Sequence, residues 1–314
     1  MTRPIRVAAV IVTYNSADVL GDCLCSLAEQ GMPMAAVVVA DNASTDKTCN
    51  IAEDFAALPV RVVELGRNAG YAAGVNAGIA ALDLSCLDAV LVLNADCQVL
   101  PGALAILASA LHQSGDGIMV PRLVLPDGST QLTLRRRPTV GRAMVEALLP
   151  GDLADRVGLL GEVVTDPQVY KRAGVTAWAT GAAMLFSVSA LREIGPWDES
   201  FLLYSEETEY CLRAADKGWR TWYEPSAVFQ HIGGESNTHP TLASLMTVNK
   251  VVLFRRRHNR LHSAAYFAVI TIGECIRAAV GRSTARASIA ALLRPSRMPE
   301  VRAEIIRGLP EPAT

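Results

Sequence analysis

The first 115 residues alternate between short, continuous apolar runs and segments whose apolar residues recur at helical spacing. Continuous apolar and β-branched runs are typical of strands that are buried on both faces of a sheet. Four such runs predict four strands, over Val7–Thr13, Ala35–Ala40, Val60–Leu65 and Asp88–Leu93. Few architectures accommodate this β-α-β-α order, which predicts a mostly parallel central sheet with helices on both faces.

The segments between these runs are expected to form helices. We expect them from Ser16 or Asp18 to about Gln30, from Ser44–Asp46 onward, over Tyr71–Leu82 and over Pro101–His112. Ser and Asp are favoured caps, and Pro101 would occupy the favoured first helical position. In sheets of this type, ligands bind beyond the carboxyl ends of the strands. Polar residues that follow a strand are therefore candidate binding residues.

The pattern changes after His112. A strand over Ile118–Leu125 and a turn at Pro126–Gly128 come first, and residues 130–175 have no clear period, which we interpret as a variable or mobile insertion. A strand over Thr176–Val188, a helix over Glu206–Lys217 and two short strands, Trp219–Tyr223 and Ala227–His231, follow. From about residue 240 the pattern is helical, over Leu245–Arg256, Leu261–Val280, Arg286–Leu293 and Glu300–Ile306.

Composition and charge exclude several classes of protein. Of the 314 residues, 51% are hydrophobic, so the chain can bury a sizeable core, and a net charge of −2 argues against bulk nucleic-acid binding. The charge is uneven, because residues 245–314 carry 12 basic and 4 acidic side chains. A basic C-terminal region favours contact with an anionic surface. Seven scattered cysteines fit neither a zinc site nor a disulfide framework, which indicates a reducing compartment.

No membrane-spanning segment is expected. The longest late apolar stretch, Ala264–Ile272, falls well short of the roughly 20 residues that a spanning helix needs. The apolar run Val7–Val12 is likewise too short for a signal peptide, and no small-residue cleavage site follows it. These features predict a cytoplasmic protein.

Two loops that follow strands carry carboxylates. Asp41, at the start of Asp41–Asp46, can accept hydrogen bonds from a nucleotide base or a ribose hydroxyl. Asn94 and Asp96 follow the fourth strand and offer the oxygen ligands that Mg²⁺ or Mn²⁺ prefers when it holds a diphosphate. The alternative for both loops is ordinary turn and cap chemistry, which selects the same residue types.

A glycine-containing loop opens the third helix. Arg67–Asn76 includes Gly70 and Gly74, and small residues at a helix N-terminus allow a phosphate to approach the backbone. The sequence of this loop matches neither the dinucleotide-binding fingerprint nor the P-loop. Dehydrogenase and P-loop functions are therefore disfavoured.

Three carboxylates, Glu206, Glu207 and Glu209, lie within one turn of a predicted helix. Their repulsion would raise a pKa or require a nearby cation, although acids are also favoured at helix N-termini by the helix dipole. His231 ends a predicted strand and is either a metal or leaving-group contact or a structural histidine. By default Trp178 and Thr180–Ala183 would pack in the core.

Taken together, seven motifs in order over residues 5–236 resemble those of inverting glycosyltransferases of the GT-A fold, family 2, rhamnosyltransferase-like branch. The motifs are Val10–Asn15, Asp41–Asp46, Asn68–Gly70 with Gly74 and Asn76, Leu93–Asp96, Trp178–Ala183, Tyr204–Glu209, and His231 with Ser236. The resemblance implies a catalytic domain over residues 1–239, with a nucleotide-sugar half (1–115) and an acceptor half (116–239), followed by a basic helical region (240–314).

The resemblance also implies residue roles. Glu207 would be the catalytic base, with Glu206 and Glu209 as a supporting acidic cluster. Asp96, with His231, would hold Mg²⁺ or Mn²⁺, and Trp178 and Gly181 would face the acceptor. Donor contacts would come from Thr13, Asn15, Asp41, Arg67, Asn68, Gly70 and Asn94. This chain departs from the family pattern where Asn94 replaces the first Asp of a DxD motif, and where glutamates stand at 207 and 209 in place of the usual aspartates.

The expected reaction is transfer of a sugar, with inversion, from a nucleoside-diphosphate donor to a hydroxyl of a glycan, lipid-linked or natural-product acceptor. A dTDP-linked 6-deoxyhexose such as rhamnose is preferred on the resemblance, and UDP-sugars stay open. The acceptor would serve cell-wall or polysaccharide synthesis if it is lipid-linked. The basic helices would then meet the anionic inner face of the membrane, or alternatively pack on the catalytic domain or in a homodimer. The alternative function is a sugar-nucleotide-binding scaffold of the same fold with impaired catalysis.

Overall fold

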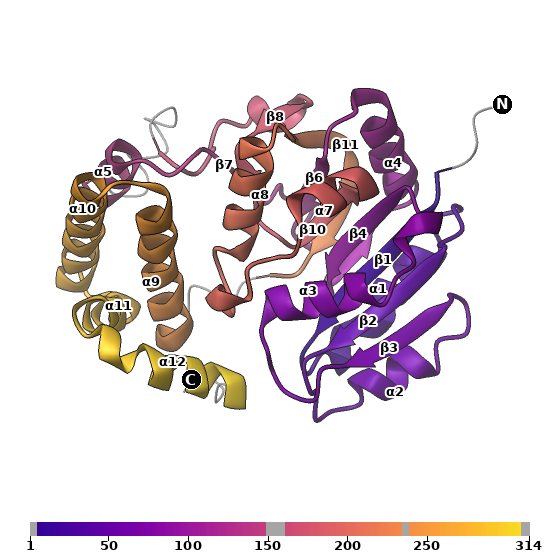
Figure 1. Ribbon diagram of the computed structural model, residues 1–314, viewed down its shortest axis with the longest axis horizontal. Coiled ribbons are helices and arrows are strands. Elements are labelled where there is room, and N and C mark those ends of the chain that lie inside the picture. Colours follow the sequence, from indigo (N-terminus) through magenta and orange to yellow (C-terminus); the bar gives the residue numbers. More distant parts are fainter. Residues whose placement is uncertain (1–4, 149–160, 234–238, 309–314) are drawn as a thin grey trace. The chain divides into compact units, whose positions relative to one another are not determined.

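The computed structural model describes residues 5–148, 161–233 and 239–308, which form a mixed α/β structure (Figure 1). The chain divides into two compact units. The first unit draws on described residues of 5–134, 167–200 and 206–233. The second draws on 135–148, 161–166, 201–205 and 239–308, so it combines the C-terminal helices with two earlier segments.

Unit 1 is built on one nine-stranded sheet in which the order is β3-β2-β1-β4-β10-β6-β11-β5, with β8 paired to β11. The first four of these strands are mutually parallel: β1 (Val7–Thr13), β2 (Ala36–Asp41), β3 (Val60–Glu64) and β4 (Ala89–Asn94). Their carboxyl ends therefore lie along one edge of the sheet. This is the arrangement that the alternating sequence pattern predicts.

The other strands form a mixed half of the sheet. They are β5 (Cys97–Val99), β6 (Ile118–Val124), β8 (Gly174–Thr176), β10 (Ala183–Ser187) and β11 (Thr221–His231). β10 runs antiparallel between β4 and β6, while β6 and β11 are parallel. A separate two-stranded sheet pairs β7 (Leu134–Arg135) with β9 (Trp178–Ala179). The antiparallel β10 thus joins the parallel half to the rest of the sheet.

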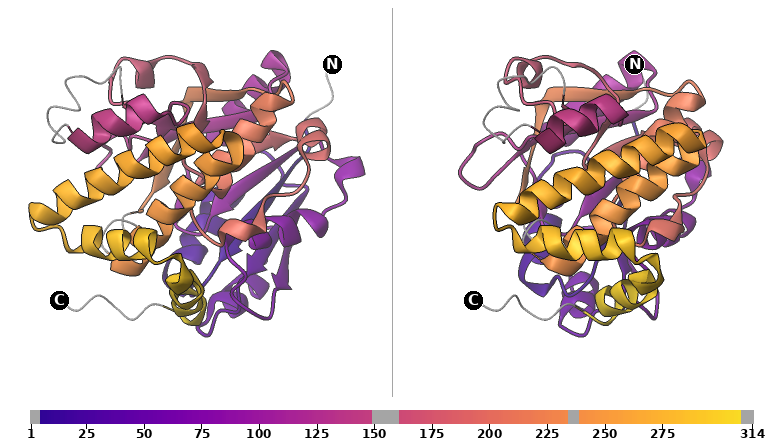
Figure 2. Two further views of the ribbon diagram at one scale, coloured as in Figure 1. Left: turned by 60° about the vertical axis from the view of Figure 1, so that its left-hand side comes forward. Right: turned by 90° about the vertical axis from the view of Figure 1, so that its left-hand side faces the viewer.

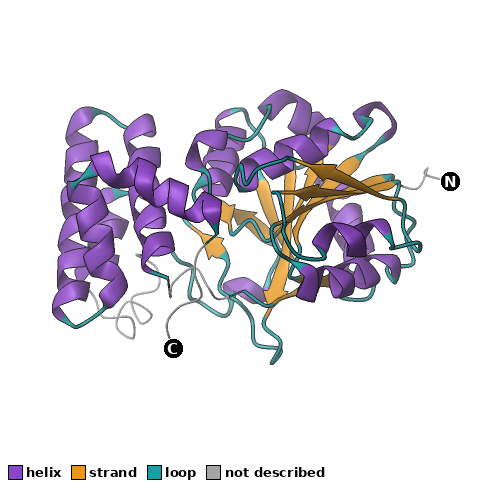
Figure 3. Ribbon diagram, turned by 90° about the horizontal axis from the view of Figure 1, so that it is seen from below, coloured by secondary structure: helices purple, strands orange, loops and turns teal. Residues whose placement is uncertain are grey.

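The helices of unit 1 lie on both sides of the sheet (Figure 3). They are α1 (Ala17–Ala28), α2 (Thr48–Glu53), α3 (Tyr71–Ala80), α4 (Ala103–Ser114), α7 (Val188–Ile194) and α8 (Glu206–Asp216). Short 3-10 turns occur at Leu84–Cys86, Val169–Lys171 and Glu199–Phe201. Val7, Ala9 and Ile11 of β1 join a core cluster with the buried face of α1. The alternate β1 residues face α3.

α3 approaches β1 closely because two of its residues are glycines. A Cβ at Gly74 would lie 2.6 Å from a methyl carbon of Val12, and one at Gly78 would meet Val10 at still shorter range. β-branched valines have few alternative rotamers, so neither neighbour can move aside easily. The two glycines therefore fix the distance between this helix and the sheet.

Unit 2 is helical. It contains α5 (Val140–Leu148), α9 (Pro240–Arg257), α10 (Arg260–Ala279), α11 (Ser283–Leu293) and α12 (Met298–Arg307), with a 3-10 turn at Pro295–Arg297. Helices α9, α10 and α11 pack against one another, and α10 also packs against α5 (Figure 2). Within the described part of the chain, no helix has both the length and the apolar character to cross a membrane.

A buried asparagine of α9 holds an unusual loop. Leu202, Tyr204 and Ser205 all have positive φ angles of 66°, 66° and 76°. Residues other than glycine rarely adopt positive φ angles, because the Cβ atom clashes with the backbone. The loop therefore needs support from its surroundings. Asn249, which is fully buried, supplies it by donating from Nδ2 to the carbonyls of Phe201, Leu203 and Tyr204 at 2.8–3.1 Å.

Several predicted bounds are wrong. α4 begins at Ala103 after a left-handed Gly102, so Pro101 does not occupy the first helical position. The predicted strand Thr176–Val188 is divided among β8, β9 and β10, because residues 180 and 182 bond to Thr133 and Asn94 instead of continuing one ladder. Conversely, the two short strands predicted over 219–231 form one strand, β11, whose register shifts between Glu224 and Val228.

The segment 130–175 is more regular than predicted. Its described residues contain β7, α5, the turn Val169–Lys171 and β8. Residues 149–160 of this predicted insertion lie outside the described residues. The short strand β5 was not predicted either, although it pairs with β11 and helps to build the site described next.

Candidate functional site

The loop after β2 is organised around the carboxylate of Asp41. Asp41 is 1% exposed, and both of its oxygens accept hydrogen bonds. Thr13 at the end of β1 donates to Oδ1 at 2.8 Å, and the backbone N–H of Ser44 donates to Oδ2 at 2.8 Å. The Ser44 hydroxyl adds a third bond, at 2.5 Å. The structure thus brings together Asp41 and Thr13, two of the residues predicted to bind the sugar nucleotide.

Asn15 and the glycine loop lie next to this turn. Asn15 is exposed, has a positive φ angle of 48°, and accepts a hydrogen bond from the Thr45 N–H at 2.8 Å. The buried Asn42 accepts from the Ala69 N–H at 3.0 Å, which ties the 67–70 loop to the end of β2. Asn68 in turn accepts from the N–H of Gly70, the N-cap of α3. Arg67 in the same loop is exposed.

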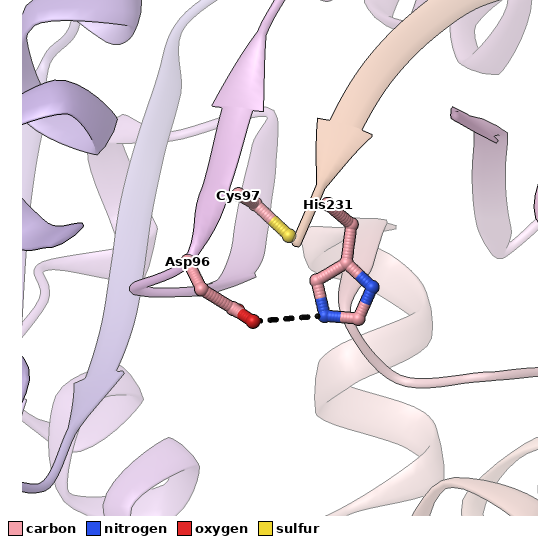
Figure 4. Close-up of side chains that lie close together, drawn as sticks. All are labelled: Asp96, Cys97 and His231. Atoms are coloured by element: carbon pink, nitrogen blue, oxygen red, sulfur yellow. Dashed lines mark ion pairs between the residues drawn. The ribbon is translucent and has the colours of Figure 1, made fainter. Parts of the chain in front are cut away.

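Asp96 and His231 meet because of the pairing between two short segments. Asp96 lies in the turn between β4 and β5, and Cys97 of β5 pairs with His231 at the end of β11. The His231 Nε2 lies 3.3 Å from Asp96 Oδ2. Figure 4 shows the two side chains pointing toward each other, with Cys97 beside them. The Gly233 N–H also donates to Asp96 Oδ2 at 3.3 Å. The two predicted metal ligands, 135 positions apart in the sequence, are therefore neighbours.

The second ring nitrogen of His231 has its own partner. His231 Nδ1 lies 3.0 Å from Gln131 Oε1, which orients the ring with Nε2 toward Asp96. A partner of this kind is typical of metal-binding histidines, whose other nitrogen is held by an outer acceptor. Burial alone would raise the pKa of Asp96, but the hydrogen bond and charge of His231, with the Gly233 amide, hold it below its ordinary value.

Cys97 lies beside this pair but does not suit a hard divalent cation. Its Sγ lies within 4.8 Å of the ligand atoms of Asp96 and His231. The thiol is buried and lies 3.3 Å from the carbonyl of Ala182, and burial raises its pKa far above the ordinary value. A protonated thiol is a poor ligand for Mg²⁺ or Mn²⁺, which prefer oxygen.

Asn94 adds an oxygen to the same turn. Its backbone N–H donates to the carbonyl of Ala182 at 2.8 Å. Its side-chain Oδ1 is buried and accepts no hydrogen bond from any residue that the structure describes. A buried acceptor without a partner is costly, which is consistent with a site that a ligand completes.

The acidic cluster at the start of α8 is divided among different environments. Glu209 makes two hydrogen bonds with Arg213 one turn later, at 2.8 and 2.9 Å, and its charge is thereby compensated. Glu206 is 3% exposed, whereas Glu207 is only half-buried. The three carboxylates are therefore not equivalent.

Glu207 packs against the segment that follows β9. A Cβ added to Gly181 would lie 3.2 Å from the Cβ of Glu207, so the glycine provides the space for this side chain. The Gly181 carbonyl accepts a hydrogen bond from Tyr71 of α3 at 2.9 Å. The neighbouring Ala182 bonds to Asn94, as described above. One short segment thus contacts Glu207, α3 and the Asp96 turn. Trp178, in β9 itself, is buried.

Four contributors to this arrangement were not predicted from the sequence. Gln131 orients His231, Asn42 ties the glycine loop to β2, and Tyr71 bonds to Gly181. The fourth is β5, without which Asp96 would not lie beside His231. Asn42 and Tyr71 lie inside the motifs Asp41–Asp46 and Arg67–Asn76, so their positions could have indicated a role. No feature of the sequence distinguishes Gln131 as a site residue. Ser236 lies outside the described residues.

Comparisons with known proteins identify relatives of this chain. The family model for glycosyl transferase family 2 matches residues 8–195. The chain is 31% identical over 232 residues to an N-acetylglucosaminyl-diphospho-decaprenol L-rhamnosyltransferase of Mycobacterium tuberculosis, covering 71% of this chain and 74% of that protein. It is 28% identical over 207 residues to the low-salt glycan biosynthesis hexosyltransferase Agl10 of Haloferax volcanii, covering 65% and 60% respectively.

Solved structures share the fold at lower identity. A mannosyltransferase from Pyrobaculum calidifontis, in complex with GDP-Man and Mn²⁺, superposes with a TM-score of 0.57 at 20% identity, over 97% of this chain and 86% of that one. TarS residues 1–349 from S. aureus, in complex with UDP-GlcNAc, superposes with a TM-score of 0.52 at 15% identity, over 98% and 93%. At these identities the likeness concerns the fold alone.

Proposed function

The chain belongs to glycosyl transferase family 2, and from this premise we propose that it is an inverting, metal-assisted transferase of a sugar from a nucleoside-diphosphate donor. The observation that supports this most is that one edge of the sheet brings together Asp96, His231 and the Gly181 segment against which Glu207 packs. The residues that the family pattern assigns to metal and base thus lie on adjoining segments.

The donor would bind along the ends of the parallel strands. Asp41, with Thr13 and Asn15, would contact the base or ribose, and Arg67, Asn68 and Gly70 the diphosphate or sugar. Exposed Arg67 and the N-terminus of α3 supply positive charge and N–H groups for phosphate. We prefer a dTDP-linked 6-deoxyhexose such as rhamnose, because a relative that is 31% identical over 232 residues is a rhamnosyltransferase.

A divalent cation fits the residues present in the Asp96 turn. Asp96 has a partly exposed carboxylate, with 30% of its side chain accessible, and the ring of His231 presents Nε2 toward it. Asn94 Oδ1, buried without a partner among the described residues, lies two positions from Asp96. Asp96 and His231 would hold Mg²⁺ or Mn²⁺, and Asn94 would offer a further oxygen from the same turn. When bound, the cation would neutralise charge on the leaving diphosphate.

Glu207 would act as the base of a direct displacement. Its carboxylate would take the proton of the acceptor hydroxyl as that oxygen forms a bond to the anomeric carbon. The bond from this carbon to the diphosphate oxygen breaks at the same time, and the nucleoside diphosphate leaves. Attack from the face opposite to the leaving group inverts the anomeric configuration. Glu206 and Glu209 would support α8, while Trp178 and Gly181 would face the acceptor.

We further propose a lipid-linked glycan acceptor and a cytoplasmic enzyme working at the inner face of the membrane. The support is the activity of the Mycobacterium tuberculosis relative, which acts on a diphospho-decaprenol-linked sugar. Such an acceptor belongs to cell-wall or polysaccharide synthesis. It also requires the enzyme to reach a membrane surface, because the lipid chain stays in the bilayer.

The deciding experiment measures donor binding and turnover over a panel of nucleoside-diphosphate sugars with Mg²⁺, Mn²⁺ or EDTA. We expect metal-dependent binding that Asp96→Ala abolishes, and turnover that Glu207→Gln abolishes while binding persists. Glu209→Gln is the matched control, since Glu209 is already engaged by Arg213, and it should retain turnover. Binding without turnover on any acceptor would favour the scaffold alternative, and no binding at all would contradict the proposal.

A further inference from the structure

The outward face of α10 is apolar along its whole length. Tyr266, Ile270 and Gly273 point inward, where the first two join a buried cluster and Gly273 packs on Ala147 of α5. The opposite face consists of exposed residues that recur at helical spacing: Leu261, Ala264, Ala265, Ala268, Ile272, Cys275, Ile276 and Ala279. None of these is charged, and the face extends for about 27 Å.

The large side chains on this face are well exposed. Leu261 is 79% accessible, Ile272 52% and Ile276 41%, and Val280 at the end of the helix is 73% accessible. Single exposed apolar residues are common, but a continuous row of them usually marks a surface that something covers. We call this row the α10 face.

Positive charge surrounds the α10 face. Between residues 255 and 294 the chain has eight arginines and one acidic residue, Glu274, which is buried and paired with Arg277. Exposed Arg260 begins the helix, and exposed Arg282 and Arg286 follow its end. An apolar strip with cations at both ends and no exposed acid matches the boundary of an anionic lipid leaflet, where acyl chains lie beneath negative headgroups.

The same charges argue against a second copy of the chain as the occupant. In an antiparallel pair of α10 helices, Arg260 of one copy would approach Arg282 and Arg286 of the other. In a parallel pair, the Arg260 ends would meet each other. Both alignments place like charges together without an acid to compensate them, which is destabilising.

We propose that the α10 face is a docking surface for an anionic membrane leaflet. Leu261, Ile272 and Ile276 insert at the level of the headgroups and upper acyl chains, while Arg260, Arg282 and Arg286 contact lipid phosphates. This deepens the proposed function, since a lipid-linked acceptor gives the enzyme a reason to dock, but neither the surface nor its test requires an acceptor.

The test is co-sedimentation of the full-length protein with vesicles of phosphatidylcholine, alone or with about one third phosphatidylglycerol. We expect binding to the anionic vesicles that weakens by about tenfold or more between about 50 mM and about 500 mM salt. Ile272→Asp with Ile276→Asp should reduce binding by at least about tenfold, because two apolar anchors become charged. Arg282→Gln should reduce it about fivefold.

Ile106→Asp is the matched control. Ile106 is a similarly exposed isoleucine, 39% accessible, but it lies on α4 of unit 1, so its substitution should leave vesicle binding unchanged.

A second measurement, with a dye on a cysteine, does not depend on the folding of the double variant. Cys275 lies on the α10 face, and after Cys25→Ser and Cys86→Ser it is the one remaining exposed thiol among the described residues. An environment-sensitive dye on Cys275 should shift to the blue on anionic vesicles.

Three results would overturn the docking surface: no binding to anionic vesicles, equal loss of binding in Ile106→Asp, or a Cys275 dye that does not respond. A wild-type dimer that Ile272→Asp converts to a monomer, without vesicle binding, would assign the face to a second copy. Donor turnover measured in the same preparations separates this failure from that of the proposed function. Turnover without vesicle binding refutes only the docking surface, and vesicle binding without donor binding refutes only the transferase.

Discussion

Asp41, the last residue of β2, and Asp96, just after β4, lie at the same edge of the sheet, but their carboxylates have different surroundings. Asp41 is almost inaccessible, and its two oxygens are occupied by Thr13 and Ser44. Asp96 is partly exposed and directs one oxygen toward His231 and the Gly233 amide. Besides the donor contact proposed for it, Asp41 therefore holds its own loop together, whereas the carboxylate of Asp96 makes fewer internal bonds and stays accessible to a ligand. The comparison predicts that the same substitution has opposite consequences at the two positions.

The largest expected effect is on catalysis at Asp96. We expect Asp96→Ala to lower metal-dependent turnover by about 10²–10³-fold, because the carboxylate would stabilise the charge of the departing diphosphate through the cation. The unfolding midpoint should change little, since the two contacts that are lost, with His231 and the Gly233 amide, are both long at 3.3 Å and partly accessible. Turnover and thermal unfolding of the same preparation test this. A large drop in stability would make Asp96 a second structural carboxylate and remove the contrast.

Asp41→Ala is expected to lower the free energy of unfolding far more than Asp96→Ala does. Three donors from Thr13 and Ser44 lose their acceptor in a buried place, which is expected to cost about 2–4 kcal/mol of unfolding free energy. Denaturant unfolding measures the loss directly. Thr13→Val removes one of these donors and should be milder, at about 1 kcal/mol. If Asp41→Ala folds with wild-type stability and loses only donor affinity, Asp41 has no structural role of its own and the contrast with Asp96 disappears.

A smaller effect is expected at Gln131. Gln131→Leu removes the partner of His231 Nδ1 and should weaken metal affinity by about tenfold, a typical cost for an outer partner of a metal-binding histidine. Titration of turnover with Mn²⁺ would show a higher half-saturation concentration and a similar maximum. A lower maximum at saturating Mn²⁺ would instead indicate that His231 acts on the leaving group without the cation.

The smallest effect is expected at Glu209. Because its charge is paired with Arg213 within α8, Glu209→Gln should cost about 1 kcal/mol of stability and leave turnover within about twofold. Side-by-side measurement with Glu207→Gln tests the division of the acidic cluster. Equal loss of turnover in both variants would contradict it.

Features that depend on residues close together in the sequence could be predicted, and features that depend on distant residues could not. β1 has the predicted bounds, and β2, β3 and β4 lie within one residue of theirs, because a continuous apolar run depends only on local burial. The residue types of the Asp96 site were predictable in the same way. Its geometry was not, since the contact with His231 depends on pairing between β5 and a strand more than a hundred residues later.

Other features had no local signal at all. Tyr204 and Ser205 adopt left-handed backbone conformations without being glycines, and it is Asn249, some 45 residues away, that supports the loop. Prediction of one strand over 176–188 failed for the same reason, because residues 180 and 182 follow distant partners instead of the local β pattern.

The close contact of α3 with β1 has a consequence for engineering donor choice. Gly74 and Gly78 have no side chain between the helix and β1. A methyl group at either position would push the helix away from the sheet, and Gly70 and Asn68 at its N-terminal end would move with it. The position of the glycine loop is thus fixed from behind, by residues that would touch no sugar. A library that randomises only the residues proposed to face the donor would not change the position of this loop. Substitution of Gly74 or Gly78 by another small residue would move the loop and so change the space for the sugar.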